Sequence, residues 1–103
     1  GRALITPKDL EILMNSGENY NLVDTRPPEQ YAQGHIGTAV NLPHETIRQA
    51  ADTLDKDAVT ITYCNKGVTG NAAQNILLNK GFKKVFTISG GFEAYKRWTS
   101  QNK

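Results

Sequence analysis

Short apolar runs alternate along the chain with segments in which apolar residues recur at helical spacing. The short runs are rich in β-branched residues and predict strands over residues 3–5, 21–24, 38–41, 58–63 and 84–88. The periodic segments predict helices over residues 7–16, 29–33, 44–54, 69–80 and 92–98. Strands that alternate with helices favour an α/β fold with a mostly parallel sheet.

Local signals mark the ends of several elements. Thr6 is suited to cap the first helix, Pro7 to take its first position, and Asp9 to return a hydrogen bond to the cap. Gly17 is suited to end that helix. Because the chain has no internal repeat, low-complexity segment or linker, we expect residues 1–103 to form one domain.

Composition narrows the class of protein. With 38% hydrophobic and 21% charged residues, the chain has the balance of a globular domain, and no apolar run is long enough to span a membrane. The net charge is only +2 and the basic residues are scattered, so we expect neither a nucleic-acid nor a membrane partner. Nothing requires more than a monomer. Because the chain starts at Gly1 and not at methionine, we expect a preceding segment to have been removed, and the compartment stays open.

The single cysteine, Cys64, directly follows the strand predicted over residues 58–63. One cysteine excludes an internal disulfide, so the fold does not depend on an oxidising compartment. Ligands of parallel α/β sheets bind beyond the carboxyl ends of the strands, where Cys64 falls. Gly67 and Gly70 permit a tight loop whose N–H groups bind an anion, and the next helix adds its positive end. The alternative is an inert packing residue; the composition of the loop favours a nucleophile.

The size of the required pKa shift indicates what would activate this thiol. A reactive cysteine often has a pKa about two units below the free value of about 8.5, which needs roughly 2.7 kcal/mol of preference for the thiolate. A helix dipole supplies about 0.3–1 kcal/mol, which is too little. We therefore expect N–H groups of the loop, aided by the charge of Lys66, to hydrogen-bond the sulfur and lower the pKa of Cys64.

Four segments together resemble the single-domain rhodanese family of thiosulfate sulfurtransferases. Residues 24–26 (DTR) are similar to the family's Asp-x-Arg segment, and residues 34–43 (GHIGTAVNLP) to its Gly-His-Ile-x-Gly-Ala-x-Asn-x-Pro segment. Residues 64–69 (CNKGVT) resemble the Cys-Arg-Lys-Gly-Val-Thr loop of thiosulfate-specific members, and residues 81–98 carry the closing Gly-Phe, Gly-Gly and Trp. The resemblance covers nearly the whole chain. It departs at Thr38, where alanine or serine is more usual, and at the asparagine of the loop.

The resemblance implies a five-stranded parallel sheet flanked by helices and a two-step reaction without a cofactor. The Cys64 thiolate would attack the outer sulfur of a donor such as thiosulfate, and sulfite would leave. The resulting persulfide would pass its sulfur to cyanide or another thiol, a protein thiol included. Lys66 would hold the sulfonate end of the donor, and Asn65 in place of arginine would make donor affinity modest. The expected substrate-binding residues are Asn65, Lys66, Gly67, Val68, Thr69 and Arg26.

Two other functions compete with this interpretation. A phosphatase of the Cys-x5-Arg type, one kind of which shares this fold, needs an arginine fork on the phosphate. Residue 70 is glycine and residues 64–70 contain no arginine, which argues against that chemistry. The second alternative is a persulfide carrier or binding module that docks on a partner protein; a cysteine in the loop favours chemistry without deciding between enzyme and carrier.

The two histidines have simpler interpretations. His35 and His44 do not form a metal-ligand pattern with Cys64, so we expect no zinc site. A catalytic Cys–His dyad would require one of them to lie within reach of Cys64. We expect His35 to make a structural hydrogen bond in its loop, and His44 to cap or begin a helix.

Several other side chains near the predicted site have structural interpretations. Asp24 and Arg26 are expected to pair near the loop, and Arg26 is also the best second cation for the site. Phe92 and Trp98 are expected in the core. Tyr63 precedes Cys64 on a strand, so its side chain should point away from the nucleophile.

Overall fold

The computed structural model describes residues 3–66 and 70–102. Its strands are β1 (Leu4–Ile5), β2 (Tyr20–Asp24), β3 (Val40–Asn41), β4 (Val59–Tyr63) and β5 (Val85–Ile88). Its helices are α1 (Pro7–Met14), α2 (Pro28–Gln33), α3 (Ile47–Ala50), the short 3₁₀ helix η1 (Ala51–Thr53), α4 (Gly70–Asn79) and α5 (Gly91–Gln101). The predicted alternation of strands and helices is confirmed.

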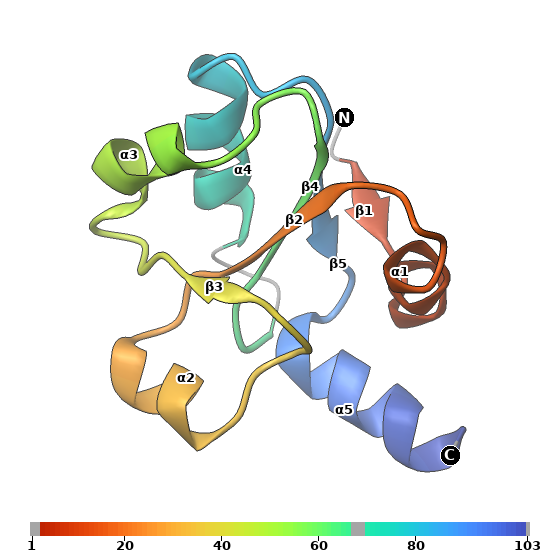
Figure 1. Ribbon diagram of the computed structural model, residues 1–103. Helices are drawn as coiled ribbons and strands as arrows, with labels where there is room; N and C mark the ends of the chain where they lie inside the picture. The colour runs from red at the N-terminus through yellow and green to blue at the C-terminus, as the bar shows by residue number, and fades with distance from the viewer. Residues whose placement is uncertain (1–2, 67–69, 103) are drawn as a thin grey trace.

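The strands form one sheet with the order β1-β5-β4-β2-β3, and every neighbouring pair is parallel. Strand β4 is central, and its register places Asp24 of β2 opposite Tyr63. Helices flank the sheet on both faces (Figure 1). The five-stranded parallel sheet expected from the resemblance is therefore confirmed. Because the carboxyl ends of β2 and β4 lie side by side, the segments that follow Asp24 and Tyr63 meet at the same edge.

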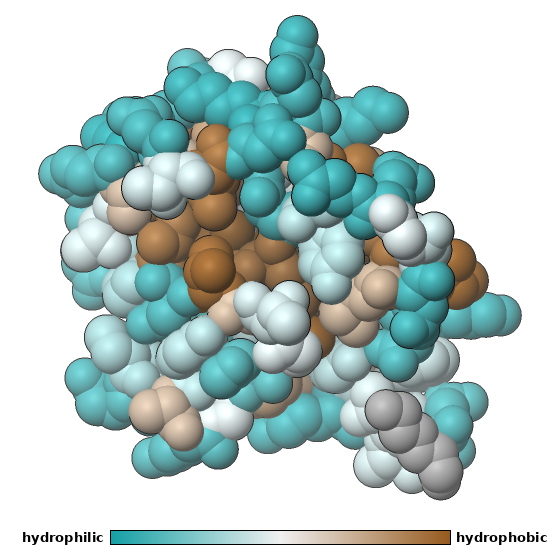
Figure 2. All heavy atoms as spheres, in the orientation of Figure 1, coloured by the Kyte–Doolittle hydropathy of each residue, from teal (hydrophilic) through white to brown (hydrophobic). Residues whose placement is uncertain are grey.

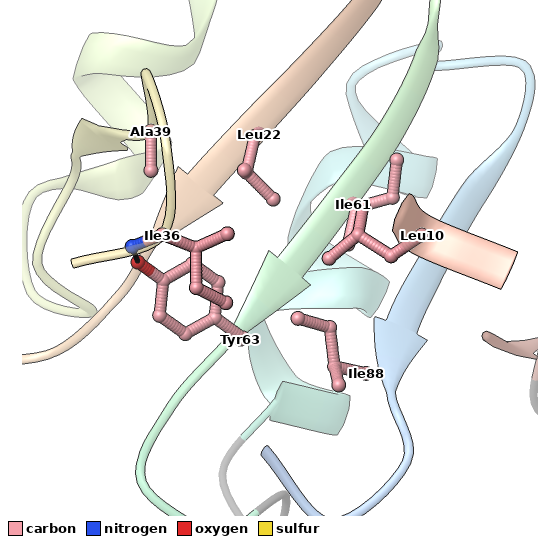
Figure 3. Close-up of a cluster of buried hydrophobic side chains, with 7 residues drawn as sticks. All are labelled: Leu10, Leu22, Ile36, Ala39, Ile61, Tyr63 and Ile88. Atoms are coloured by element: carbon pink, nitrogen blue, oxygen red, sulfur yellow. Dashed lines mark hydrogen bonds between the residues drawn. The ribbon is translucent and has the colours of Figure 1, made fainter. Parts of the chain in front are cut away.

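Each face of the sheet carries its own hydrophobic cluster, because successive residues of a strand point to opposite faces. Helices α1, α2 and α5 pack on one face, where the buried cluster is Leu10, Leu22, Ile36, Ala39, Ile61, Tyr63 and Ile88 (Figure 3). Helices α3 and α4 pack on the other face, where the buried cluster is Val23, Ile47, Ala51, Ala73, Leu77, Phe82 and Val85.

Tyr63, the last residue of β4, is fully buried in the first cluster. Its hydroxyl oxygen accepts a hydrogen bond of 3.0 Å from the buried N–H of Ile36, as the dashed line in Figure 3 shows. Burial raises the pKa of Tyr63 well above its ordinary range. The side chain is thus a core residue on the face of the sheet opposite α4.

Replacement of Tyr63 by phenylalanine is expected to lower the free energy of unfolding by about 1–3 kcal/mol. The cause is the Ile36 N–H, which would stay buried without an acceptor. Tyr95→Phe is the matched control, since that hydroxyl donates to the Glu11 carboxylate at 2.9 Å in a partly exposed place. Urea denaturation of the two variants should show the larger loss for Tyr63→Phe; equal losses would contradict the prediction.

The helix predicted over residues 44–54 is much shorter than expected. Residues 44–46 form a turn in which the Thr46 N–H donates to the Pro43 carbonyl at 2.8 Å. Only residues Ile47–Ala50 are α-helical, and η1 follows at once. The prediction that His44 caps or begins this helix is wrong, because Thr46 is the N-cap.

The surface of this molecule is mostly hydrophilic in the view of Figure 2, and its hydrophobic residues gather mainly around β2 and β3. Val40 of the edge strand β3 is 42% exposed there. β3 has two residues and pairs with β2 only at Val23 and Asp24, so part of the β2 edge stays open. Within the described residues, no helix has the length and apolarity needed to cross a membrane.

Candidate active site

Cys64 directly follows the central strand and is 7% exposed. Its carbonyl oxygen accepts a hydrogen bond of 2.8 Å from the N–H of Phe92, and the Asn65 carbonyl accepts one of 3.1 Å from the N–H of Glu93. Both donors lie in the first turn of α5, where N–H groups have no partner within the helix. The Cys64 segment is therefore joined through its backbone to the start of α5.

Gly90 sets the position of α5 against this segment. It is the N-cap of α5, has a φ of 77° and carries no side chain that could cap the helix. A Cβ at this position would lie 2.6 Å from the Cβ of Ala94, so a larger residue would push the first turn of α5 away. Glycine is needed here both for the left-handed backbone and for the close approach of Ala94.

Asp24 and Arg26 form a buried ion pair where β2 ends. Asp24 is fully buried and Arg26 is 5% exposed. The guanidinium donates to both carboxylate oxygens, with its shortest hydrogen bond at 2.7 Å, and the Arg26 N–H adds one of 2.9 Å. Burial alone would lower the pKa of Arg26, but the hydrogen bonds and negative charge of Asp24 outweigh it and the pKa is raised. The structural pair predicted from the sequence is present.

The loop after β2 is tied to the end of β4. The N–H and the hydroxyl of Thr25 both donate to the Tyr63 carbonyl, each at 3.0 Å. The side-chain amide of Asn41 donates to the carbonyl oxygens of Asp24 and Arg26 at 3.0 and 2.9 Å. Arg26 is thus held next to the residue that precedes Cys64.

Two cationic side chains, Arg26 and Lys96, lie close to the aromatic ring of Phe92. The guanidinium carbon of Arg26 lies 4.2 Å from the centre of the Phe92 ring, and the ammonium nitrogen of Lys96 lies 4.9 Å from it. Both distances are within the range of cation–π attraction. The side chain of Phe92 is only partly buried and packs against the core cluster, so the prediction that it is a core residue is only partly correct. Phe92 also lines a cavity.

This cavity has a volume of about 490 Å³ and is lined by Arg26, Gln30, Gln33, Gly34, Asn65, Phe92 and Lys96. Its lining residues belong to the segments that follow β2 and β4, to α2 with the glycine after it, and to the start of α5. The side-chain amide of Asn65 donates to the side-chain carbonyl of Gln30 at 2.8 Å, which joins the Cys64 segment to α2. Because the lining is basic and amide-rich, the cavity suits a small polar anion.

The family comparison agrees with this arrangement. The profile of the Rhodanese-like domain matches residues 6–97, which is most of the chain. The chain belongs to the Rhodanese-like domain family. Its one cysteine directly follows the central strand, and the next residue, Asn65, lines the basic cavity.

Three relatives illustrate the range of the similarity. The thiosulfate sulfurtransferase GlpE of Pseudomonas entomophila is 36% identical over 75 residues, which cover 73% of this chain and 69% of that protein. A protein of Bacillus halodurans of known structure is 29% identical, with a TM-score of 0.84 over 94% of this chain and 73% of that one. A rhodanese-like domain protein of Staphylococcus aureus is 25% identical, with a TM-score of 0.82 over 90% of both chains.

The structure brings together some of the predicted site residues of this rhodanese-like domain. Asn65 and Arg26 line the cavity, and Cys64 directly precedes Asn65 in the chain. Lys66 is exposed. The predictions for residues 67–69 (Gly67, Val68 and Thr69) lie outside the described residues.

Other lining residues were missed by the sequence reasoning. Gln30 and Gln33 of α2 and Lys96 of α5 enter the cavity only because the two helices converge there. A signal for Lys96 was present, since it lies four residues after Phe92 and therefore on the same face of α5.

The histidines lie outside the cavity lining. The Nδ1 atom of His35 is 3.0 Å from the Tyr31 carbonyl oxygen, and its ring stacks on the Tyr31 ring at 3.8 Å. The prediction of a structural hydrogen bond is confirmed for His35. His44 is exposed in the turn before α3.

Proposed function

We propose that this rhodanese-like domain is a sulfurtransferase that moves sulfane sulfur from thiosulfate, or a related donor, to cyanide or a thiol. The observation that carries the proposal is the position of Cys64, the only cysteine of the chain, directly after the central strand and directly before Asn65, which lines a basic cavity. The similarity to GlpE, a thiosulfate sulfurtransferase, supports thiosulfate as the donor. The intermediate is a persulfide on Cys64.

The reaction has two displacement steps. In the first, the Cys64 thiolate attacks the outer sulfur of thiosulfate; the bond between the two donor sulfurs breaks, and its electron pair leaves with sulfite. In the second, cyanide or a thiolate attacks the outer sulfur of the persulfide. The bond to the Cys64 sulfur breaks, and its electron pair restores the thiolate, so charge and sulfur balance over the cycle.

Each site residue has a proposed part in these steps. Lys66, which is exposed beside Cys64, pairs with the sulfonate of the donor. The thiolate and the persulfide are both anions, and we assign their stabilisation to the backbone of the loop after Cys64 and to the start of α4 at Gly70, because a helix N-terminus binds anions. Asn65 and Arg26 add hydrogen-bond donors from the cavity side.

The direct test is the intact mass of the protein. Incubation with thiosulfate, followed by removal of small molecules, is expected to add the mass of one sulfur atom, and cyanide is expected to remove it again. A sample treated with sulfate is the control for anion adducts. No gain in mass from thiosulfate or polysulfide would contradict the proposal. A gain that neither cyanide nor small thiols reverse would favour a persulfide carrier for a partner protein.

A further inference from the structure

The positive charge of the cavity comes mainly from Lys96. The charge of Arg26 is matched by Asp24, whose carboxylate it contacts at 2.7 Å. Lys96 is exposed and lies above the Phe92 ring; among residues 3–66 and 70–102, no carboxylate pairs with it. An anion entering the cavity would therefore find an ammonium group that is not already neutralised.

The remaining lining adds hydrogen-bonding groups and an apolar surface. The Gln30 side-chain carbonyl accepts a hydrogen bond from the Asn65 side-chain amide, so the Gln30 amide nitrogen and the Asn65 side-chain carbonyl can serve a ligand. Gln33 adds a third amide, and the partly buried ring of Phe92 adds an apolar wall. The volume of about 490 Å³ is large for thiosulfate alone, since one water occupies about 30 Å³ in the liquid. Such a mixture fits a molecule with a short carbon chain and an anionic end.

We propose that the cavity is the acceptor site, and that the acceptor is a small thiol that carries a carboxylate. The carboxylate pairs with the Lys96 ammonium, the carbon chain packs on Phe92, and the thiolate approaches the outer sulfur at Cys64 past Asn65, the lining residue that directly follows it. The inference rests on the proposed function, because it assigns the second substrate of that reaction. The thiolate forms a bond to the outer sulfur, the bond to Cys64 breaks, and the products are a small persulfide and the Cys64 thiolate.

The kinetic test measures discharge of the loaded persulfide in a single turnover. The acceptors are mercaptopropionate, mercaptoethanol and cysteamine, which carry a negative, a neutral and a positive group. For Lys96→Gln, the ratio of the rate with mercaptopropionate to the rate with mercaptoethanol is expected to fall about two- to fivefold, the range for a single exposed ion pair. For Lys96→Glu, the ratio of the mercaptopropionate rate to the mercaptoethanol rate should fall further. The ratio of the cysteamine rate to the mercaptoethanol rate should rise. Arg97→Gln, the matched change on an exposed neighbouring cation of α5, should leave both ratios unchanged.

A binding test does not depend on persulfide chemistry. Mercaptopropionate is titrated into ¹⁵N-labelled Cys64→Ser, and the side-chain amide signals of Gln30 and Asn65 are followed by NMR. These signals should shift with mercaptopropionate, and the shifts should be much weaker when Lys96→Gln is added. Absence of shifts would overturn the acceptor site.

The two tests separate the inference from the proposed function. Wild-type protein that takes up no sulfur contradicts the function, while the NMR titration still decides whether the cavity binds the thiol. If thiosulfate loads the wild type normally but Lys96→Gln leaves the ratio of the mercaptopropionate rate to the mercaptoethanol rate unchanged, the acceptor site is overturned and the proposed function stands. If Lys96→Gln slows loading by thiosulfate and not discharge, Lys96 serves the donor and the acceptor assignment is wrong.

Discussion

Replacement of Cys64 by serine is expected to abolish sulfur transfer, with a loss in kcat/KM of about a thousandfold or more. A serine hydroxyl is not ionised near neutral pH and cannot hold a sulfane sulfur, so neither step of the proposed reaction can proceed. The variant should also show no gain in mass after treatment with thiosulfate. Steady-state formation of sulfite and thiocyanate, measured with thiosulfate and cyanide, provides the rate.

The same substitution should leave the fold in place. Cys64 is joined to α5 through its carbonyl oxygen, which every amino acid supplies. We therefore expect the free energy of unfolding to change by about 1 kcal/mol or less, and Cys64→Ala to behave in the same way. Transfer by the serine variant at a rate near the wild type would mean that the donor and acceptor react without Cys64, which would contradict the persulfide mechanism.

Replacement of Asp24 by alanine is expected to have the largest effect on stability, a loss of about 3–5 kcal/mol. The Arg26 guanidinium would stay buried at the end of β2 without its carboxylate. Such a loss is a large part of the 5–15 kcal/mol by which a domain of this kind is typically stable. Urea denaturation at neutral pH measures it directly.

Asp52→Ala is the matched control for this change. The Asp52 carboxylate also contacts cations, with Lys80 at 3.3 Å and Lys56 at 3.6 Å, but its side chain is 62% exposed. Exposed ion pairs contribute little, because water and salt screen them. The free energy of unfolding of the Asp52 variant should therefore remain close to that of the wild type. If Asp24→Ala and Asp52→Ala lower it equally, burial is not the reason that the Asp24 pair stabilises the fold.

Most of the fold could be predicted from local patterns, and the exceptions have local causes. The strand at Val59–Tyr63 was evident because it is rich in β-branched residues, and the structure buries most of it. Thr6 caps α1 through its hydroxyl, which accepts from the Asp9 N–H at 3.1 Å, as Thr-Pro at a helix start indicates. The helix over residues 44–54 was overpredicted, because Ile47 and Ala51 have helical spacing in a segment that is otherwise exposed and begins with a turn.

Only those site residues that lie in short continuous motifs could be predicted from the sequence. Cys64 and Asn65 belong to one short segment, and Asp24 and Arg26 to another, so motifs could identify both. The cavity also needs α2 and α5, whose approach depends on packing against the sheet. Gln30 and Lys96 are ordinary surface residues in the sequence, and only the tertiary structure brings them to one cavity.

The hydrogen bonds from the first turn of α5 to Cys64 and Asn65 join two parts of the chain that are distant in the sequence. The amide protons of Phe92 and Glu93 can exchange with solvent only when they leave the carbonyl oxygens of the nucleophile segment. Hydrogen exchange at these two amides therefore reports on the release of the Cys64 segment as well as on the opening of the first turn of α5.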